Sequence, residues 1–569
     1  MRTAIHLCRS GGARALLATI VVALAVCSGC SASESASAEK QARAIGATAS
    51  MTPPTERAPA ATPSDFAGLQ AASTHPANPL QDGWFAMYIE GTKVGYGKTV
   101  TNRVVEHGQA LNQVVEEVHF SVVRNGQPSD ERVVSTGIET PTGQLLRFRT
   151  EIESGSAPIV TTGEVRDGDM CFQTISTGTV TRTFLPWEAR VGGFKATEQS
   201  LVARPMQPGE RRNLKGLMVG FNQIAEIEMV AGAYEPTQML NHSEELLRIQ
   251  WTATLPKGNT IAAEWWMNRD GEVMKMQLDA LRQVTFRTTR EIALAETGPA
   301  RFDLLLSTRV RVNRPLVRPN RTKRVRYRVQ LESADPSRVF ASCASQRVTP
   351  LDAHTAEIEV RAARPIRNAA TAAAATATPA DGIADPALNL APPGSQQDSP
   401  PTEEDRTANS LVQCDDPRII ALAGQAAGSR TDPWEVAVAL EKFTHDYITG
   451  RNYSKAFSTA VEVAESREGA CTQHAVLLAA LARARGLPAR VAIGLVYTES
   501  TPGFAFHMWN EVWIGGRWIP LDATRGTGGV GAAQLKLADS SLAGEAAYSC
   551  FLPVSQVIGQ IKIEILEVE

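Results

Sequence analysis

The sequence has almost no net charge and lacks the motifs of metal and phosphate sites. Its 57 Lys and Arg nearly balance 60 Asp and Glu, giving a formal net charge of −3, so no basic surface for nucleic acid is predicted. No CxxC or HExxH spacing surrounds the cysteines and histidines beyond residue 30. The glycine-rich run at 526–531 follows no strand–loop–helix pattern that would cradle phosphate. We therefore expect no cofactor, no metal and no nucleic-acid partner.

Long apolar runs are also scarce, and the one that stands out lies at the N-terminus. Residues 15–26 are apolar, follow three arginines, and are too few to span a bilayer as a stable anchor. This pattern predicts a bacterial export signal over residues 1–30. Small residues before Cys30 resemble a lipobox, although Cys27 stands where leucine is usual. We expect lipid on Cys30 to hold the exported protein at a membrane of the cell envelope. The alternative is an ordinary cleaved signal peptide.

Cysteine is rare, with eight residues in the whole chain. Two lie in the export signal, one is the candidate lipid site, and one is the candidate nucleophile considered below. Export permits disulfides, but the remaining four allow three pairings, and buried free thiols fit the sequence equally well. These four are Cys171, Cys343, Cys414 and Cys550.

Composition divides the rest of the chain. Residues 31–81 and 365–412 are rich in Ala, Pro, Thr and Ser, which predicts a disordered tether and a linker. Between them, β-branched runs and hairpin turns such as Asn125-Gly126 predict an antiparallel β-rich domain at 82–298 and a small β-sandwich-like module at 299–364. The histidines of this middle region have no evident chemical neighbours in the sequence and are treated as ordinary residues: His107, His119, His242 and His354.

The segment 413–569 holds the most informative residue, Cys471. The apolar run at 475–485 has helical spacing and ends at a Gly-Leu-Pro stop, so Cys471 lies at or near a helix N-terminus. Unpaired N–H groups and the positive end of the helix dipole favour a thiolate there. The N–H groups of Cys471 and Thr472 could also hold an oxyanion. A lone cysteine before an apolar helix is more often a small buried side chain.

A predicted hairpin downstream supplies a base and a carboxylate. Residues 506–514 and 517–524 read as strands joined by Gly515-Gly516. If Ile514 pairs with Arg517, then His507 and Asp522 become diagonal neighbours on one face, within hydrogen-bond reach. A base with an orienting carboxylate is what a thiol nucleophile requires.

Four segments of this region resemble the transglutaminase-like superfamily, which shares a papain-like core. They are Gly469-Ala470-Cys471, the run from Ala480 to Val491, His507-Met508-Trp509-Asn510-Glu511-Val512 and Trp518-Ile519-Pro520-Leu521-Asp522-Ala523-Thr524. The resemblance implies Cys471 as nucleophile, His507 as base and Asp522 as orienting carboxylate. It also implies an oxyanion donor upstream of the cysteine, for which Tyr453 is a candidate, with plain packing as the alternative.

The expected fold is therefore multidomain: an antiparallel β-rich N-terminal region, then a C-terminal α+β transglutaminase-like domain at 413–569. The resemblance implies acyl transfer or hydrolysis at an amide of a protein or peptide substrate, through a Cys thioester. The rival is a cell-envelope binding or scaffold protein with an inactive domain. An active enzyme should bring Cys471 and His507 together in an open cleft, whereas apolar packing around them would favour the rival.

Overall fold

The computed structural model describes residues 81–153, 158–176, 179–256, 260–278, 282–295, 303–363, 398–455, 457–543 and 551–569. The export signal with Cys30, nearly all of the 31–81 tether, the linker up to residue 397 and Cys550 lie outside these residues. Within the described ranges, no helix combines the length and the apolar character needed to cross a membrane.

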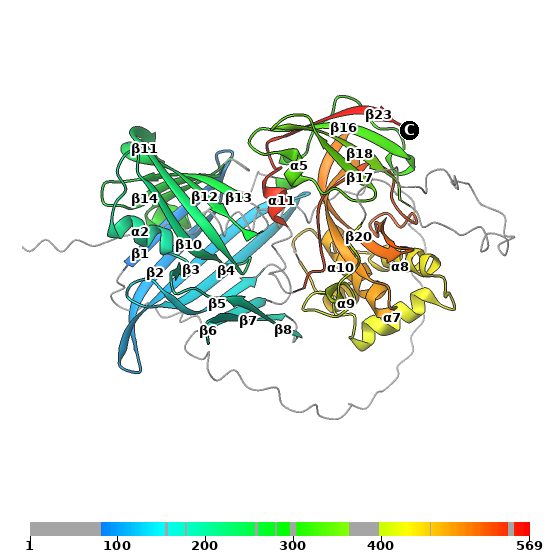
Figure 1. Ribbon diagram of the computed structural model, residues 1–569, viewed down its shortest axis with the longest axis horizontal. Helices are drawn as coiled ribbons and strands as arrows, with labels where there is room; N and C mark the ends of the chain where they lie inside the picture. Colours follow the sequence, from blue (N-terminus) through cyan, green and yellow to red (C-terminus); the bar gives the residue numbers. More distant parts are fainter. Residues whose placement is uncertain are drawn as a thin grey trace, which may run out of the picture.

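The β-rich region forms one large sheet (Figure 1). Its 15 strands run in the order β8 to β1 and then β15 to β9, so the first strand pairs with the last. All neighbouring pairs are antiparallel except β9 and β10. The strands are β1 (Gln81–Ile89), β2 (Thr92–Glu106), β3 (Gln109–Arg124), β4 (Gln127–Glu139), β5 (Leu145–Glu153), β6 (Ile159–Arg166), β7 (Asp169–Ser176), β8 (Thr179–Pro186), β9 (Val191–Gly192), β10 (Arg211–Met218), β11 (Gln223–Gln238), β12 (Ser243–Thr254), β13 (Thr260–Met267), β14 (Val273–Leu278) and β15 (Gln283–Thr288).

Local turns and alternating burial account for this sheet. Asn125 and Gly126 both adopt positive φ between β3 and β4, as a tight hairpin turn of primed type requires. Strand β3 alternates buried and less buried residues along most of its length, which places one face on the core. Buried residues from both arms of the sheet, such as Phe120 and Trp251, belong to a single hydrophobic cluster. The sheet therefore folds over its own core.

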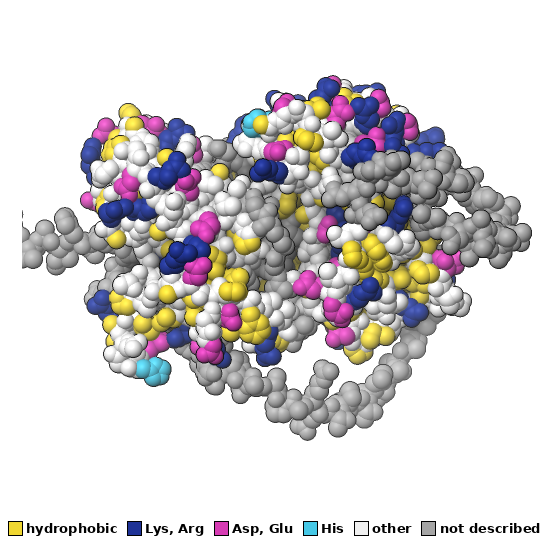
Figure 2. Space-filling model, in the orientation of Figure 1, with side chains coloured by type: hydrophobic (Ala, Val, Ile, Leu, Met, Phe, Trp, Pro, Cys, Tyr) yellow, Lys and Arg dark blue, Asp and Glu magenta, His cyan; other side chains and the backbone are white. Residues whose placement is uncertain are grey.

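A second sheet joins segments that are far apart in the sequence. Its order is β17 (Gln346–Pro350), β18 (Thr355–Arg361), β16 (Arg324–Leu331) and β23 (Ile561–Val568). The strands expected for the 299–364 module thus pair with a strand from the segment assigned to the C-terminal domain. Arginines of β16 pair with glutamates on both neighbours; Arg326, for example, contacts Glu357 and Glu567. Basic and acidic side chains intermingle over this part of the surface in Figure 2.

The C-terminal domain packs helices against a third sheet. Helix α10 (Cys471–Ala484) contacts α7 (Pro417–Ala427), α8 (Pro433–Tyr447), α9 (Ala460–Ser466) and two strands of the sheet. The sheet order is β21 (Arg517–Leu521), β20 (Gly503–Ile514), β19 (Ala489–Thr498) and β22 (Gln534–Ser540). Asp416 and Asp432 cap α7 and α8, each with a proline at the first helical position.

Several short helices complete the described residues. They are α2 (Ala196–Ala203), α3 (Arg290–Leu294), α4 (Leu304–Ser307), η4 (Pro319–Arg321), α5 (Pro336–Val339), η6 (Glu403–Asp405) and α11 (Leu552–Ser555). Helix α11 precedes β23 in the chain and contacts β22 of the third sheet.

Candidate active site

Cys471 is the first residue of α10, as the sequence predicts. The turn into the helix is closed by Gln473, whose Oε1 accepts the Ala470 backbone N–H at 2.9 Å and the Thr472 hydroxyl at 2.9 Å. Gly469 allows this approach, because a Cβ there would lie 2.3 Å from the Gln473 Cβ. The backbone around Cys471 is therefore held in place by the hydrogen bonds of the Gln473 side chain to Ala470 and Thr472.

The predicted hairpin has the predicted register. Ile514 pairs with Arg517, and the ladder continues to Asn510 opposite Leu521. Gly515 and Gly516 adopt φ of +61° and +82°, which suits a two-residue hairpin turn. The strand β21 ends at Leu521, and Asp522 follows directly.

His507 and Asp522 meet as the diagonal pairing requires. His507 Nε2 lies 2.9 Å from Asp522 Oδ2, and both side chains are buried. The other carboxylate oxygen accepts the Thr524 hydroxyl at 2.6 Å, and Gln534 Nε2 donates to Oδ2 at 3.3 Å. Burial acts to raise the pKa of Asp522, but the His507 charge and hydrogen bond, with Arg525 nearby, hold that pKa below its ordinary value. Asp522 is therefore an ionised partner for His507 at neutral pH.

His474 lies on the first turn of α10, where the charges of His507 and Asp522 act on it. It lies one turn after Cys471, and its Nδ1 is 2.7 Å from the Ala470 carbonyl oxygen. Burial lowers the pKa of His474 to about 4, and the charges of Asp522, His445 and His507 also act on it. The first turn of α10 thus lies within electrostatic reach of the His507–Asp522 pair, and His474 is neutral at pH 7.

Glu441 on α8 binds the backbone at and near Asp522. It is not among the site residues predicted from the sequence. Its side chain accepts the backbone N–H groups of Asp522 at 2.9 Å and of Gly528 at 2.7 Å. Burial raises the pKa of Glu441 to about 7. A signal existed, because Leu440, Glu441 and Thr444 share the buried stripe of α8. Part of the glycine-rich run thus binds Glu441 next to Asp522.

Tyr453 lies beside the nucleophile segment. Its side chain is buried and forms a small hydrophobic cluster with Ala470, the residue before Cys471. Its backbone N–H donates to the side chain of Gln127 at 2.8 Å. Thr472 is also buried, with its hydroxyl used by Gln473. Both oxyanion candidates are therefore close to Cys471 in the fold, and packing also holds Tyr453 in place.

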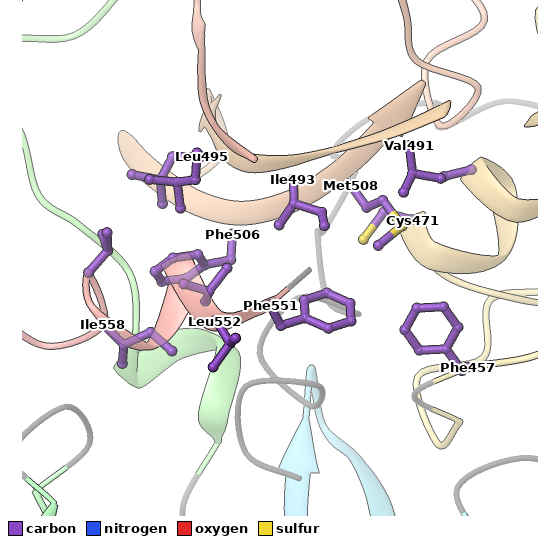
Figure 3. Packing of buried hydrophobic residues seen from close by; sticks show 14 of the residues in the cluster. Phe457, Cys471, Val491, Ile493, Leu495, Phe506, Met508, Phe551, Leu552 and Ile558 are labelled. Atoms are coloured by element: carbon purple, nitrogen blue, oxygen red, sulfur yellow. The ribbon is translucent and has the colours of Figure 1, made fainter. Parts of the chain in front are cut away.

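The Cys471 thiol is covered by apolar side chains. Cys471 is only 1% exposed. Figure 3 shows Phe457, Phe551 and Met508 around it, and the two phenyl rings meet edge to face with centroids 5.6 Å apart. A substrate carbonyl reaches the sulfur only if one of these side chains moves. In the part of the chain that the structure describes, the Cys471 side chain is therefore buried, whereas an active enzyme is expected to present it in an open cleft.

The remaining cysteines and histidines can also be compared with the predictions made from the sequence. Within the described residues, Cys171, Cys343 and Cys414 form no disulfide. Across the described ranges, no three His, Cys, Asp or Glu residues form a group that could hold a metal ion. The view that His119 has no chemical neighbour is wrong: its Nε2 is 2.8 Å from Glu117, and its ring stacks on Tyr96. Residues two apart on a strand share a face, so the contact between His119 and Glu117 could have been predicted from the sequence.

A buried ion cluster fixes the back of the hairpin. Lys536 Nζ on β22 lies 2.7 Å from Glu511 on β20 and 2.8 Å from Asp539. Arg490 on β19 pairs with the same two carboxylates at 2.8 and 2.9 Å. These pairs tie together the three strands that hold His507.

Comparison with known proteins identifies the central part of this domain. Residues 420–523 match the model of the Transglutaminase-like superfamily. No curated protein sequence matches the chain.

Three solved structures share weak similarity with the chain. A suspected cysteine protease from Cytophaga hutchinsonii is 15% identical, over 44% of this chain and 89% of its own, with a TM-score of 0.24. A β-barrel-like protein of unknown function from Brucella abortus is 10% identical, over 36% and 94%, with a TM-score of 0.28. A protein of an uncharacterised family from Pseudomonas aeruginosa is 10% identical, over 31% and 87%, with a TM-score of 0.17. Structural similarity at this level shows neither a shared fold nor a shared activity.

The family match covers most of α7, then α8, α9, α10, β19 and the hairpin of β20 and β21. Cys471 on α10, His507 on β20 and Asp522 directly after β21 follow one another in the order that the sequence motifs indicate. Residues 420–523 of this chain therefore form a transglutaminase-like domain, preceded by a large β-rich region.

Proposed function

We propose that this domain is a thiol enzyme that acts on amide bonds of a protein or peptide. The contact that carries the proposal is the buried His507–Asp522 pair, with Nε2 and Oδ2 2.9 Å apart. A base held by an ionised carboxylate is the partner that a thiol nucleophile needs. The position of Cys471 at the start of α10 supports the proposal, because the helix N-terminus favours a thiolate.

The reaction follows from these roles. Because Nε2 of His507 faces Asp522, Nδ1 is the nitrogen that takes the Cys471 proton. The thiolate attacks the amide carbonyl carbon, and the carbonyl π electrons move to oxygen, where the N–H groups of Cys471 and Thr472 and the Tyr453 side chain are the candidate donors. Collapse expels the amine, which takes the proton from His507, and leaves a thioester. An amine or water then attacks the thioester with His507 as base, and the thiol is restored.

The test is the pH dependence of Cys471 alkylation by iodoacetamide, followed by peptide mass spectrometry. We expect reaction well below the ordinary thiol pKa of about 8.5, and loss of that reactivity in His507→Ala. Cys414 is an internal reference, because burial raises the pKa of its thiol. A Cys471 that is inert, or indifferent to His507, would refute the enzyme.

A second candidate is a binding or scaffold protein of the cell envelope with an inactive domain. The 1% exposure of Cys471 favours it, because a catalytic thiol must reach its substrate. The alkylation experiment separates the two candidates when it is done on the native protein. Rapid modification requires the phenyl rings to move on their own, whereas modification only after unfolding supports the scaffold.

We also propose that the protein is exported and held at a membrane by lipid on Cys30, with the β-rich region presenting or recognising substrate. The apolar stretch at 15–26 and the small residues before Cys30 support this. Expression of Cys30→Ser in a bacterial host tests it. The variant should move from the membrane fraction to the soluble fraction, and an unchanged distribution would contradict lipid anchoring.

A further inference from the structure

The hairpin of β3 and β4 docks on the loop that precedes the nucleophile. Gln127, the first residue of β4, holds the loop main chain at two points. Its Oε1 accepts the Tyr453 N–H at 2.8 Å, and its Nε2 donates to the Arg451 carbonyl at 3.4 Å. Nearby, the Ser129 hydroxyl donates to the Ser454 carbonyl at 3.0 Å. Hydrogen bonds from the β-rich region therefore hold the backbone of residues 451–454.

The other side of this loop is attached to the start of α10. Gln473 Nε2 donates to the Lys455 carbonyl at 3.4 Å, and the same Gln473 side chain closes the turn at Ala470. The Tyr453 ring packs with Ala470. A continuous set of contacts thus runs from Gln127 through the loop to the residue before Cys471.

A cavity lies along the same junction. It has a volume of about 700 Å³, and its walls include Pro128 and Asp130 of the hairpin, and Ser454 and Lys455 of the loop. A molecule bound in this cavity would contact both partners of the junction. The junction is therefore a place where the β-rich region can act on the chemistry of the C-terminal domain.

We propose that Gln127 is a positioning residue for the thiol chemistry: it fixes the 451–455 loop so that Tyr453 is held beside Cys471 when the oxyanion forms. This inference rests on the proposed function. Donors stabilise an oxyanion only when they are held in place before the reaction, and a displacement of about 1 Å can cost about 100-fold in rate. The Tyr453 N–H donates to Gln127 and is not available to an oxyanion. The side chain of Tyr453 is therefore the group of this loop that we propose as the oxyanion donor.

Two reagents separate positioning from simple docking. p-Nitrophenyl acetate acylates a thiol through an oxyanion, whereas iodoacetamide alkylates it without one. In the full chain, Gln127→Ala should slow acylation of Cys471 about tenfold and leave the pH midpoint of alkylation as in the wild type. A role limited to folding would lower the two reactions together, which would overturn the proposal.

Three further variants sharpen the result. Gln127→Glu keeps an acceptor for the Tyr453 N–H and should retain most of the acylation rate. Gln109→Ala, which changes an exposed glutamine at the far end of β3, should react as the wild type. Tyr453→Phe should slow acylation as Gln127→Ala does, and the double variant should be no slower than Tyr453→Phe alone, because both act through one group.

Each outcome has one meaning. Acylation of Gln127→Ala at the wild-type rate, or multiplicative losses in the double variant, would overturn the role of Gln127 and leave the thiol enzyme standing. A wild-type Cys471 that reacts with neither reagent would reject the proposed function, and this inference with it.

Discussion

Replacing Asp522 by Asn removes the charge that faces His507 and keeps the size of the side chain. The wild-type carboxylate accepts from His507, Thr524 and Gln534. If the Asn amide oxygen faces His507, its NH₂ group opposes the Thr524 hydroxyl and backbone N–H. If the NH₂ group faces His507 instead, Nε2 must accept, and Nδ1 then carries a proton and cannot take one from Cys471.

The size of the effect follows from the charge that is lost. Two unit charges about 4 Å apart interact by about 4 kcal/mol at an effective dielectric constant of about 20. Since about 1.4 kcal/mol is tenfold in an equilibrium, the thiolate–imidazolium pair should become about a thousandfold less populated. Alkylation of Cys471 at pH 6 should slow by about that factor. The rate should approach the wild-type value above about pH 9, where an unassisted thiol ionises.

The assay is the iodoacetamide rate at Cys471 from pH 5 to 10, with circular dichroism to show that the variant is folded. Thr524→Val is the matched control, because it removes one hydrogen bond to Asp522 and leaves the charge. We expect its rate at pH 6 to fall less than tenfold. A folded Asp522→Asn protein whose pH profile follows the wild type would refute the reasoning that Asp522 stabilises the pair.

Three other outcomes are expected. Lys536→Met should destabilise the fold by about 1.5–3 kcal/mol in urea unfolding, because it removes charged hydrogen bonds and leaves Arg490 as the one cation between Glu511 and Asp539; a loss below about 1 kcal/mol would contradict this. Burial raises the pKa of Glu441 to about 7, so its contribution to stability is full below the unfolded pKa near 4.5 and is lost as the pH rises through 7. Glu441→Gln should therefore flatten the fall in melting temperature between pH 5 and 8, and parallel curves for the two proteins would count against it. Phe551→Ala should speed modification of native Cys471 by N-ethylmaleimide at least tenfold, while Leu552→Ala should not; equal rates in all three proteins would mean that the Phe551 ring is not the cover.

The hairpin that carries His507 could be predicted in detail because its signals are local. Gly515-Gly516 sets the turn, and the turn sets the pairing of every residue up to Asn510 and Leu521. The start of α10 was equally accessible, since a glycine, an apolar helical run and a Gly-Leu-Pro stop mark its two ends.

Contacts between distant segments were not accessible in the same way. Nothing near Gln127 in the sequence indicates that its side chain meets the main chain of Tyr453, 326 residues away. The burial of Cys471 has the same origin, because Phe551 comes from a segment with no periodic pattern that points to the cysteine. Local patterns fix elements and registers, whereas such contacts depend on how whole elements pack.

The pairing of β16 with β23 has a consequence for biosynthesis. Arg326 and Glu567 are 241 residues apart in the sequence, so β16 and β18 leave the ribosome long before β23 exists. During that interval, one edge of β16 presents unpaired backbone groups that could pair with another chain. The alternating arginines of β16, which later meet glutamates on β23, carry like charges that discourage pairing with a second copy of the same strand. The arginines that form ion pairs in the finished sheet should therefore also reduce association between incomplete chains.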